Sequence, residues 1–196
     1  MTPRDPVHVT VRLVRQVRNL RTRGAALVLR AAFEGGRDRL GFRLVHFSVQ
    51  PAHLHLIAEA DDARALGRGM KGLGVRIARR LNRLLGRRGR VLADRYHARV
   101  LRKPASVRGA LLYVLQNARH HDETGAPPAG VPWTDPYSSA RAFDGWASPP
   151  PRAGPAPTQA PPVAAPKAWL LQQGWRRRGL IDLCEAPPRR APRVRR

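Results

Sequence analysis

The first 121 residues of the chain carry its regular hydrophobic patterns. Residues 7–13 (VHVTVRL) place an apolar side chain at every second position, which is typical of a strand with one buried face. Residues 41–50 (GFRLVHFSVQ) alternate again and, with residues 53–60 (HLHLIAEA), predict a hairpin. Residues 96–101 (YHARVL) are a fourth strand candidate.

Three stretches of the same region have helical patterns. Residues 22–35 have the composition of a helix, and a Gly-Gly pair stops it. The Asp pair at 61–62 can cap a second helix that runs to about residue 85, with large apolar side chains on one side. A third helix begins at Pro104, because proline fits the first turn of a helix, and continues to residue 120.

The predicted order of elements is therefore β-α-β-β-α-β-α. This is the split βαβ, or ferredoxin-like, pattern with one helix added at its C-terminal end. We expect an α+β fold in which an antiparallel sheet has helices on one face, and in which the additional C-terminal helix carries part of the functional site.

The composition changes near residue 121. Fifteen of the nineteen prolines lie from residue 127 onward, and proline removes a backbone donor and fixes φ. We expect one domain over residues 1–121 and a proline-rich basic tail over residues 122–196. Within the tail we predict a flexible linker (147–166), a short ordered element with Trp169 and Trp175 (168–181) and a basic disordered end (187–196).

The net charge of the chain indicates what kind of partner it binds. The net charge is +24, which points to a polyanion such as nucleic acid. All but three of the 37 basic residues are arginines, whose forked guanidinium suits phosphate, although a GC-rich genome would produce the same bias.

The rest of the composition sets limits. A single cysteine excludes an internal disulfide framework and a CxxC zinc site. No apolar run approaches the roughly 20 residues of a membrane helix, and the first residues lack the apolar stretch of a signal peptide. We expect no membrane partner and a location in the bacterial cytoplasm, in association with the nucleoid.

The candidate chemistry begins with a His-x-His pair. His53 and His55 are two apart on a predicted strand, so they point to the same face and can reach one divalent metal; packing or solvent exposure is the alternative. Tyr113 and Asn117 are four apart on the last helix and share a face. Asn117 offers a carbonyl oxygen, which suits Mg²⁺ or Mn²⁺.

These four residues together favour attack on a phosphodiester. A divalent cation neutralises the charge that repels a nucleophile, and a tyrosine phenol can then attack and form a covalent intermediate. The alternative for Tyr113 is a half-buried aromatic that packs on the sheet. Tyr96 is a rival nucleophile, but it has no polar partner four residues further along.

Four segments together resemble the single-tyrosine members of the HUH endonuclease superfamily, and within it the REP-associated tyrosine transposases and their insertion-sequence relatives. They are HVTVRL, GFRLVHFSVQPAHLHLIAEA, RGMKGLGVRIARRLNRLLGRRGRVLADRYHARVL and ALLYVLQNARHH, and they span roughly residues 6–121. The resemblance implies a ferredoxin-like fold, metal-dependent cleavage of single-stranded, hairpin-forming DNA, and a 5′-phosphotyrosine intermediate, as in DNA transposition. Such relatives include both monomers and homodimers, so either state is expected.

The resemblance also assigns roles. It makes His53 and His55 metal ligands, Tyr113 the nucleophile and Asn117 the polar ligand from the helix. Where relatives often have an Asn-Pro step this chain has Asn117-Ala118, which a helix tolerates because alanine is a good helix former. The proline-rich tail lies outside the shared core.

Further residues have two open interpretations each. Glu59 shares the strand face of the His pair and either contacts metal or a neighbouring helix, or forms a structural ion pair. His8 and His46 are on neighbouring strands, where core packing explains them. The arginine candidates for DNA contact, with solvation as the alternative, are Arg76, Arg79, Arg80, Arg83, Arg87, Arg88, Arg90 and Arg95. His120 and His121 end the last helix, where we expect helix capping or DNA contact in preference to catalysis.

Two other functions remain open. A non-catalytic ferredoxin-like protein would bind nucleic acid through exposed aromatic residues, for which Phe42 and Phe47 are the candidates, although they have opposite strand parity. A nuclease of the HUH type retained by its host would keep the chemistry without mobility.

Overall fold

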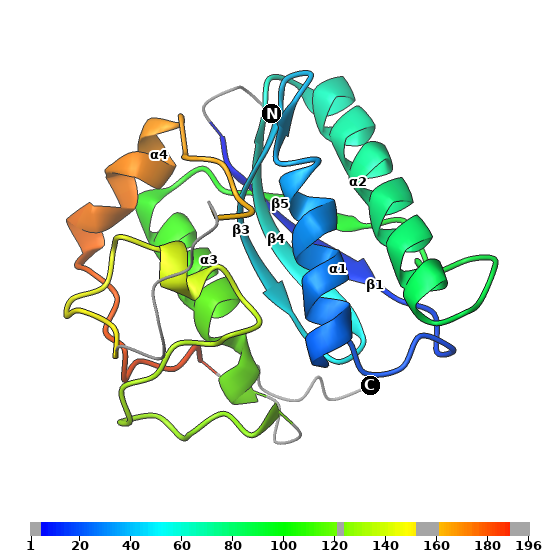
Figure 1. The fold of residues 1–196 in the computed structure, drawn as a ribbon. Helices are drawn as coiled ribbons and strands as arrows, with labels where there is room; N and C mark the ends of the chain where they lie inside the picture. Colours follow the sequence, from blue (N-terminus) through cyan, green and yellow to red (C-terminus); the bar gives the residue numbers. More distant parts are fainter. Residues whose placement is uncertain (1–4, 121–123, 152–160, 189–196) are drawn as a thin grey trace, which may run out of the picture.

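The computed structural model describes residues 5–120, 124–151 and 161–188 of the chain (Figure 1). Five antiparallel strands form one sheet in the order β2-β3-β4-β1-β5, so the predicted α+β class and antiparallel sheet are confirmed. The strands are β1 (Val7–Arg12), β2 (Asp38–Arg39), β3 (Phe42–Val49), β4 (His53–Ala60) and β5 (His97–Val100). The helices are α1 (Arg23–Glu34), α2 (Ala63–Leu84), α3 (Pro104–Gln116) and α4 (Trp169–Gln172), with 3₁₀ turns η1 (Asn117–His120), η3 (Ala140–Ala142) and η4 (Gly174–Arg178).

Helices α1 and α2 cover one face of the sheet, as expected for the split βαβ pattern (Figure 1). Both begin at the predicted caps: the Thr22 hydroxyl accepts from the Ala25 amide at 3.2 Å, and the Asp62 carboxylate accepts from the Ala65 amide at 2.6 Å. The alternate apolar residues of β1 and β4 bury themselves under these helices. At Gly69, helix α2 comes so close to β3 that an added Cβ would lie 2.1 Å from Phe42 Cγ.

Two features of the sheet were not predicted. The short strand β2 pairs with the start of β3 through a turn at Leu40 and Gly41, both of which have positive φ. A bulge also interrupts β3, because Leu44 pairs with Ala58 whereas His46 pairs with Ile57. The extra residue reverses the alternation of side chains along the strand.

Helix α3 lies on the opposite face of the sheet, over β3 and β4 (Figure 1). It forms a second hydrophobic core with Val45 and Ile57 of the sheet. Leu101, just before α3, also belongs to this core, and the segment after residue 123 supplies Ala140, Phe143, Trp146, Leu171, Trp175, Ile181 and Leu183.

The C-terminal segment is therefore packed on the domain, and a division at residue 121 does not separate the two cores. The predicted ordered element near 168–181 coincides with α4 and η4. The prediction of a flexible linker is wrong for residues 161–166, since the Ala164 amide donates to the Leu44 carbonyl at 2.8 Å. This hydrogen bond uses only backbone groups at the edge of β3, so no side-chain pattern announces it. The proline content alone therefore led to the wrong prediction. Residues 152–160 and 189–196 lie outside the described residues.

Among the described residues, no helix has the length and apolar character needed to span a membrane.

Candidate active site

His53 and His55 lie side by side on β4, on the face that α1 and α2 leave to α3. Their ring centroids are 4.7 Å apart and the rings are nearly perpendicular. His55 is buried and His53 is half-buried. Leu54 and Leu56, between and beyond them, point into the first core, so the alternation of the strand aims both imidazoles at the same side.

Helix α3 places Tyr113 above this pair. Apolar residues on its inner side, among them Leu111 and Val114, are fixed in the second core. Tyr113 itself is half-buried, and its ring lies 5.0 Å from that of His55 in a perpendicular arrangement. It also lies 5.9 Å from the ring of His120, which belongs to η1. The nucleophile candidate and the histidine pair are thus brought together.

Asn117 lies one turn beyond Tyr113, at the start of η1. It is fully buried, and neither atom of its carboxamide has a hydrogen-bond partner in the described part of the chain. Buried polar groups without partners are rare in folded proteins, and each one calls for an explanation such as a bound ion.

The described residues contain no group of three or more His, Cys, Asp or Glu side chains placed to hold a metal. A third protein ligand from this region would therefore be of another type. The amide oxygen of Asn117 is such a ligand, and it suits Mn²⁺ or Mg²⁺ better than softer metals.

Two residues of β1 contact His55: Thr10, which the sequence did not single out, and His8, for which core packing was the expectation. Thr10 is its cross-strand neighbour on β1, and the Thr10 hydroxyl lies 3.2 Å from Nδ1 of His55. Nε2 of His8 lies 3.3 Å from the same nitrogen, and the His8 ring also contacts Tyr113 at 5.7 Å. Their even positions in the alternating β1 segment indicated this face, but only the register with β4 shows that they meet His55.

His8 is neutral near pH 7. Burial, together with the electrostatic effect of Arg99 and His97, lowers its pKa from 6.5 to about 4. A neutral imidazole beside His55 adds no charge to the site and can either donate or accept a hydrogen bond.

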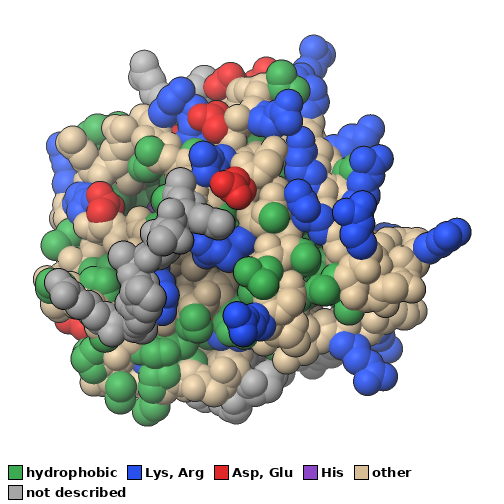
Figure 2. All heavy atoms as spheres, in the orientation of Figure 1, with side chains coloured by type: hydrophobic (Ala, Val, Ile, Leu, Met, Phe, Trp, Pro, Cys, Tyr) green, Lys and Arg blue, Asp and Glu red, His purple; other side chains and the backbone are tan. Residues whose placement is uncertain are grey.

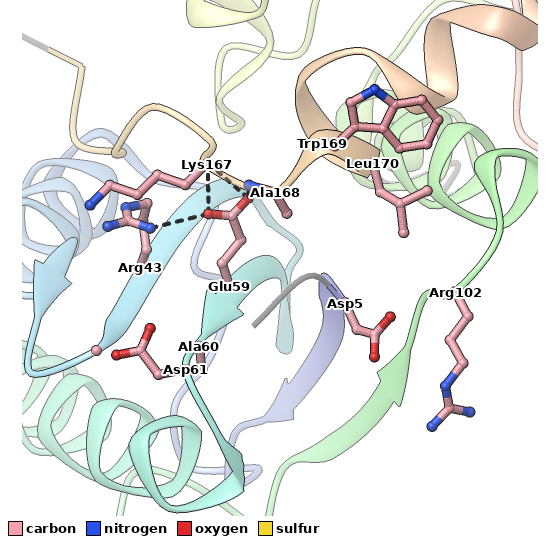
Figure 3. A pocket seen from close by; sticks show the side chains of 11 residues that line it. Asp5, Arg43, Glu59, Ala60, Asp61, Arg102, Lys167, Ala168, Trp169 and Leu170 are labelled. Atoms are coloured by element: carbon pink, nitrogen blue, oxygen red, sulfur yellow. Dashed lines mark hydrogen bonds and ion pairs between the residues drawn. The ribbon is translucent and has the colours of Figure 1, made fainter. Parts of the chain in front are cut away.

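Glu59 is not near Tyr113; it forms the structural ion pair that was one of its two interpretations. Its carboxylate is buried, lies 3.2 Å from the Arg43 guanidinium, and accepts hydrogen bonds from the backbone amides of Lys167 and Ala168 (Figure 3). It borders a cavity of about 650 Å³ at the far end of β4, whose wall includes Trp169.

Three other candidates are displaced from the site. Tyr96 packs against the first core, on the side of the sheet away from His55. Phe42 and Phe47 are both buried in that core, because the bulge in β3 puts them on one face. The expected exposed aromatic platform is therefore absent at these two positions. His46 is buried against Phe143 and Ser139.

The arginines predicted to contact DNA fall into two groups. Those of α2 lie on the opposite face of the sheet from Tyr113; Arg79, Arg80 and Arg83 are exposed and Arg76 is half-buried, and Lys and Arg side chains line α2 in Figure 2.

The second group follows α2 in the loop before β5 and consists of Arg87, Arg88, Arg90 and Arg95. This loop is tied to the end of β1, since the Ala93 amide donates to the Arg12 carbonyl at 2.9 Å. Arg12 is the cross-strand partner of His53, so this group lies at the sheet end that carries the histidine pair. His121 lies outside the described residues.

No protein-family model matches the chain, and a search of curated protein sequences found no relative. Among solved structures, the chain is similar to a REP-associated tyrosine transposase bound to a REP hairpin, with a TM-score of 0.50 and 19% identity over 69% of this chain and 76% of the other. It also matches a protein of Deinococcus radiodurans R1 whose assignment as a transposase is provisional, with a TM-score of 0.42 and 18% identity over 50% and 78% of the two chains. At such identity the first likeness establishes a shared fold: the chain has the architecture of a REP-associated tyrosine transposase.

Proposed function

We propose that this chain cleaves and rejoins single-stranded, hairpin-forming DNA, with Tyr113 as the nucleophile and His53, His55 and Asn117 as ligands of a divalent metal. The observation that carries the proposal is the edge-to-face chain of ring contacts from Tyr113 through His55 to His53, with Asn117 one turn further along from Tyr113. The Tyr113 ring contacts His55, His55 contacts His53, and the buried carboxamide of Asn117 follows one turn later.

The residues fit the metal by the chemistry of their donors. Two imidazole nitrogens and one amide oxygen make a mixed ligand set, and imidazole favours a transition metal over Mg²⁺. We therefore expect Mn²⁺ to bind more tightly than Mg²⁺. A divalent metal bound there would neutralise and polarise the scissile phosphate.

Thr10 and His8 hold His55 in place for this role. The Thr10 hydroxyl oxygen can accept a hydrogen bond from an N–H at Nδ1 of His55, and that tautomer presents Nε2 as the ligand nitrogen. His8 contacts the same Nδ1 and the Tyr113 ring, so it orients both groups toward each other.

In the proposed reaction the phenol oxygen of Tyr113 attacks the phosphorus of a phosphodiester. A bond forms between this oxygen and phosphorus, and the bond from phosphorus to the deoxyribose 3′ oxygen breaks. The phenol loses its proton and the departing 3′ oxygen takes one up, so the products are a 5′-phosphotyrosine and a free 3′-hydroxyl. Since no water is consumed, a 3′-hydroxyl can reverse the step and join two strands.

A purely DNA-binding role is the second candidate. The net charge of +24 supports this role, but the role does not explain why the carboxamide of Asn117 is buried without a hydrogen-bond partner in the described part of the chain. Phe42 and Phe47, the candidates for its aromatic platform, are both buried.

Incubation with a labelled hairpin oligonucleotide and Mn²⁺ tests the proposal. We expect a covalent protein–DNA adduct on a denaturing gel, its loss in chelator, and its loss in Tyr113→Phe. The matched control is Tyr96→Phe, which removes the same hydroxyl from the other side of the sheet and should leave the adduct unchanged. Absence of any adduct, or an adduct in Tyr113→Phe, would show that the proposed chemistry is wrong.

A further inference from the structure

The face of the sheet that carries His53 and His55 is covered only in part. Helix α3 packs over β3 and β4, and the neighbouring strands β1 and β5 continue the same face beyond it. On that side the cross-strand rows run from His55 through Thr10 to His97, and from His8 to Arg99. Adjacent strands are about 4.8 Å apart, so His97 is about 10 Å from the strand of His55.

The exposed residues of this surface are basic. Arg12, His97 and Arg99 are exposed, whereas His8 and Thr10 are half-buried between them and the site. We call Arg12, His97 and Arg99 the basic shelf. Neither β1 nor β5 carries an acidic residue, and among the described residues Arg12 and Arg99 form no ion pair.

The basic shelf lies next to Tyr113 on the same face of the sheet. The Tyr113 ring touches His8, and Arg99 is the cross-strand partner of His8. Arg12 pairs across the strands with His53, so the two arginines flank the site along β1 and β5. A polyanion with one phosphate at Tyr113 would find cationic side chains next along this surface. The arginines of α2, by contrast, are separated from Tyr113 by the whole sheet.

We propose that the basic shelf binds the phosphates of the single-stranded DNA segment that adjoins the scissile phosphodiester. The proposal rests on the proposed function for the position of the scissile bond, but it concerns binding and needs no cleavage. Phosphate contacts position a strand without reading its sequence, and the flat ring of His97 adds a surface on which a base can stack.

The test measures binding of a fluorescent single-stranded oligonucleotide to the full chain by anisotropy over a series of salt concentrations, in chelator. The variant is Arg12→Gln/Arg99→Gln, and the matched control is Arg64→Gln/Arg68→Gln, which removes two exposed arginines from α2 on the other face. Each phosphate contact to a single strand contributes about 0.7 to the slope of log K against log salt. We expect the slope of the shelf variant to fall by about 1.4, which corresponds to roughly 25-fold weaker binding at 0.1 M salt. The control should change far less.

Charge rescue separates phosphate binding from damage to the fold. Arg12→Lys/Arg99→Lys should restore most of the slope, since lysine also neutralises a phosphate. An equal loss in the shelf and control variants, no loss in the shelf variant, or an equal loss for a duplex of the same sequence would overturn the proposal. So would a change in the mass of the protein in solution, because the shelf would then be a contact between two copies.

The adduct assay tests the proposed role of Tyr113 and the salt series tests the basic shelf, so either proposal can be refuted without the other. If Tyr113→Phe still forms the covalent adduct but the shelf variant loses the salt slope, the shelf stands as a single-strand surface and the nucleophile is wrong. If the adduct depends on Tyr113 and the shelf variant binds like the parent, the chemistry stands and the shelf is wrong.

Discussion

Replacement of Asn117 by leucine should make the metal-free protein more stable and should abolish its stabilisation by metal. The Asn117 side chain is fully buried and its carboxamide oxygen and nitrogen have no hydrogen-bond partner in the described part of the chain. A buried polar group without a partner costs about 1–3 kcal/mol. Leucine has a similar size and no polar atom, so Asn117→Leu should raise the free energy of unfolding of the metal-free protein by at least about 1 kcal/mol.

The same substitution should abolish stabilisation by metal. A ligand present at about 100 times its Kd stabilises the native state by about 2.7 kcal/mol. For a chain of this size, 1 kcal/mol corresponds to about 2–4 °C in Tm. Thermal unfolding should therefore show the parent rising by about 5–10 °C in saturating Mn²⁺, whereas Asn117→Leu begins a few degrees higher and does not respond.

Two results would contradict this reasoning. If Asn117→Leu lowers the Tm of the metal-free protein by several degrees, its carboxamide has a structural role. If the variant keeps the full rise in Mn²⁺, the residue is not a ligand. Asn117→Asp is the matched control: it retains an oxygen donor, so it should keep a response to metal while losing the gain in stability.

Three further predictions concern packing, pH and metal. Gly69→Ala should lower stability by about 1–2 kcal/mol in chemical denaturation, because its Cβ would overlap the Phe42 ring; Gly67→Ala, with nothing within 4 Å, should instead stabilise α2 by up to about 1 kcal/mol. Burial lowers the pKa of His46 from 6.5 to about 4, so the unfolded chain takes up its proton first. His46 should contribute a fall in stability of up to about 3 kcal/mol between pH 6.5 and pH 4, and His46→Gln should remove that part of the slope in denaturation curves taken at each pH. Titration calorimetry should give a lower Kd for Mn²⁺ than for Mg²⁺; the reverse order would argue against two imidazole ligands.

The folded core could be read from the sequence because its patterns are local. Alternation placed β1 and β4, and the caps Thr22 and Asp62 placed the starts of α1 and α2. Alternation failed in β3, since one extra residue at Val45 shifts the parity between Phe42 and Phe47. Nothing in the composition marks such a bulge.

The grouping of the candidate residues could be predicted only where they share one element. His53 and His55 lie two apart on a strand, and Tyr113 and Asn117 four apart on a helix and its continuation. The neighbours Thr10 and His8, and the basic shelf beyond them, depend on which strand lies beside β4 and in what register. That information is long-range and is not written in any single segment.

The C-terminal segment shows the same limit from the other direction. Its prolines prevent long helices, and its core residues are spaced irregularly, so no period reveals them. Phe143 and Trp175 lie in loops and short turns, and they are buried because they cover the side of α3 that the sheet does not.

The contact between Glu59 and the segment at Lys167 has a consequence for the order of events during synthesis. All residues of the strands, α1 and α2 have been synthesised once the ribosome has passed β5. The residues that cover the outer side of α3 and that donate hydrogen bonds to the Glu59 carboxylate are synthesised much later. About 70 residues separate Tyr113 from Leu183, which a ribosome adds in roughly 4–14 s. The growing chain thus holds Tyr113 on an unfinished surface during this interval, and the second core around α3 is complete only after Leu183 has been added.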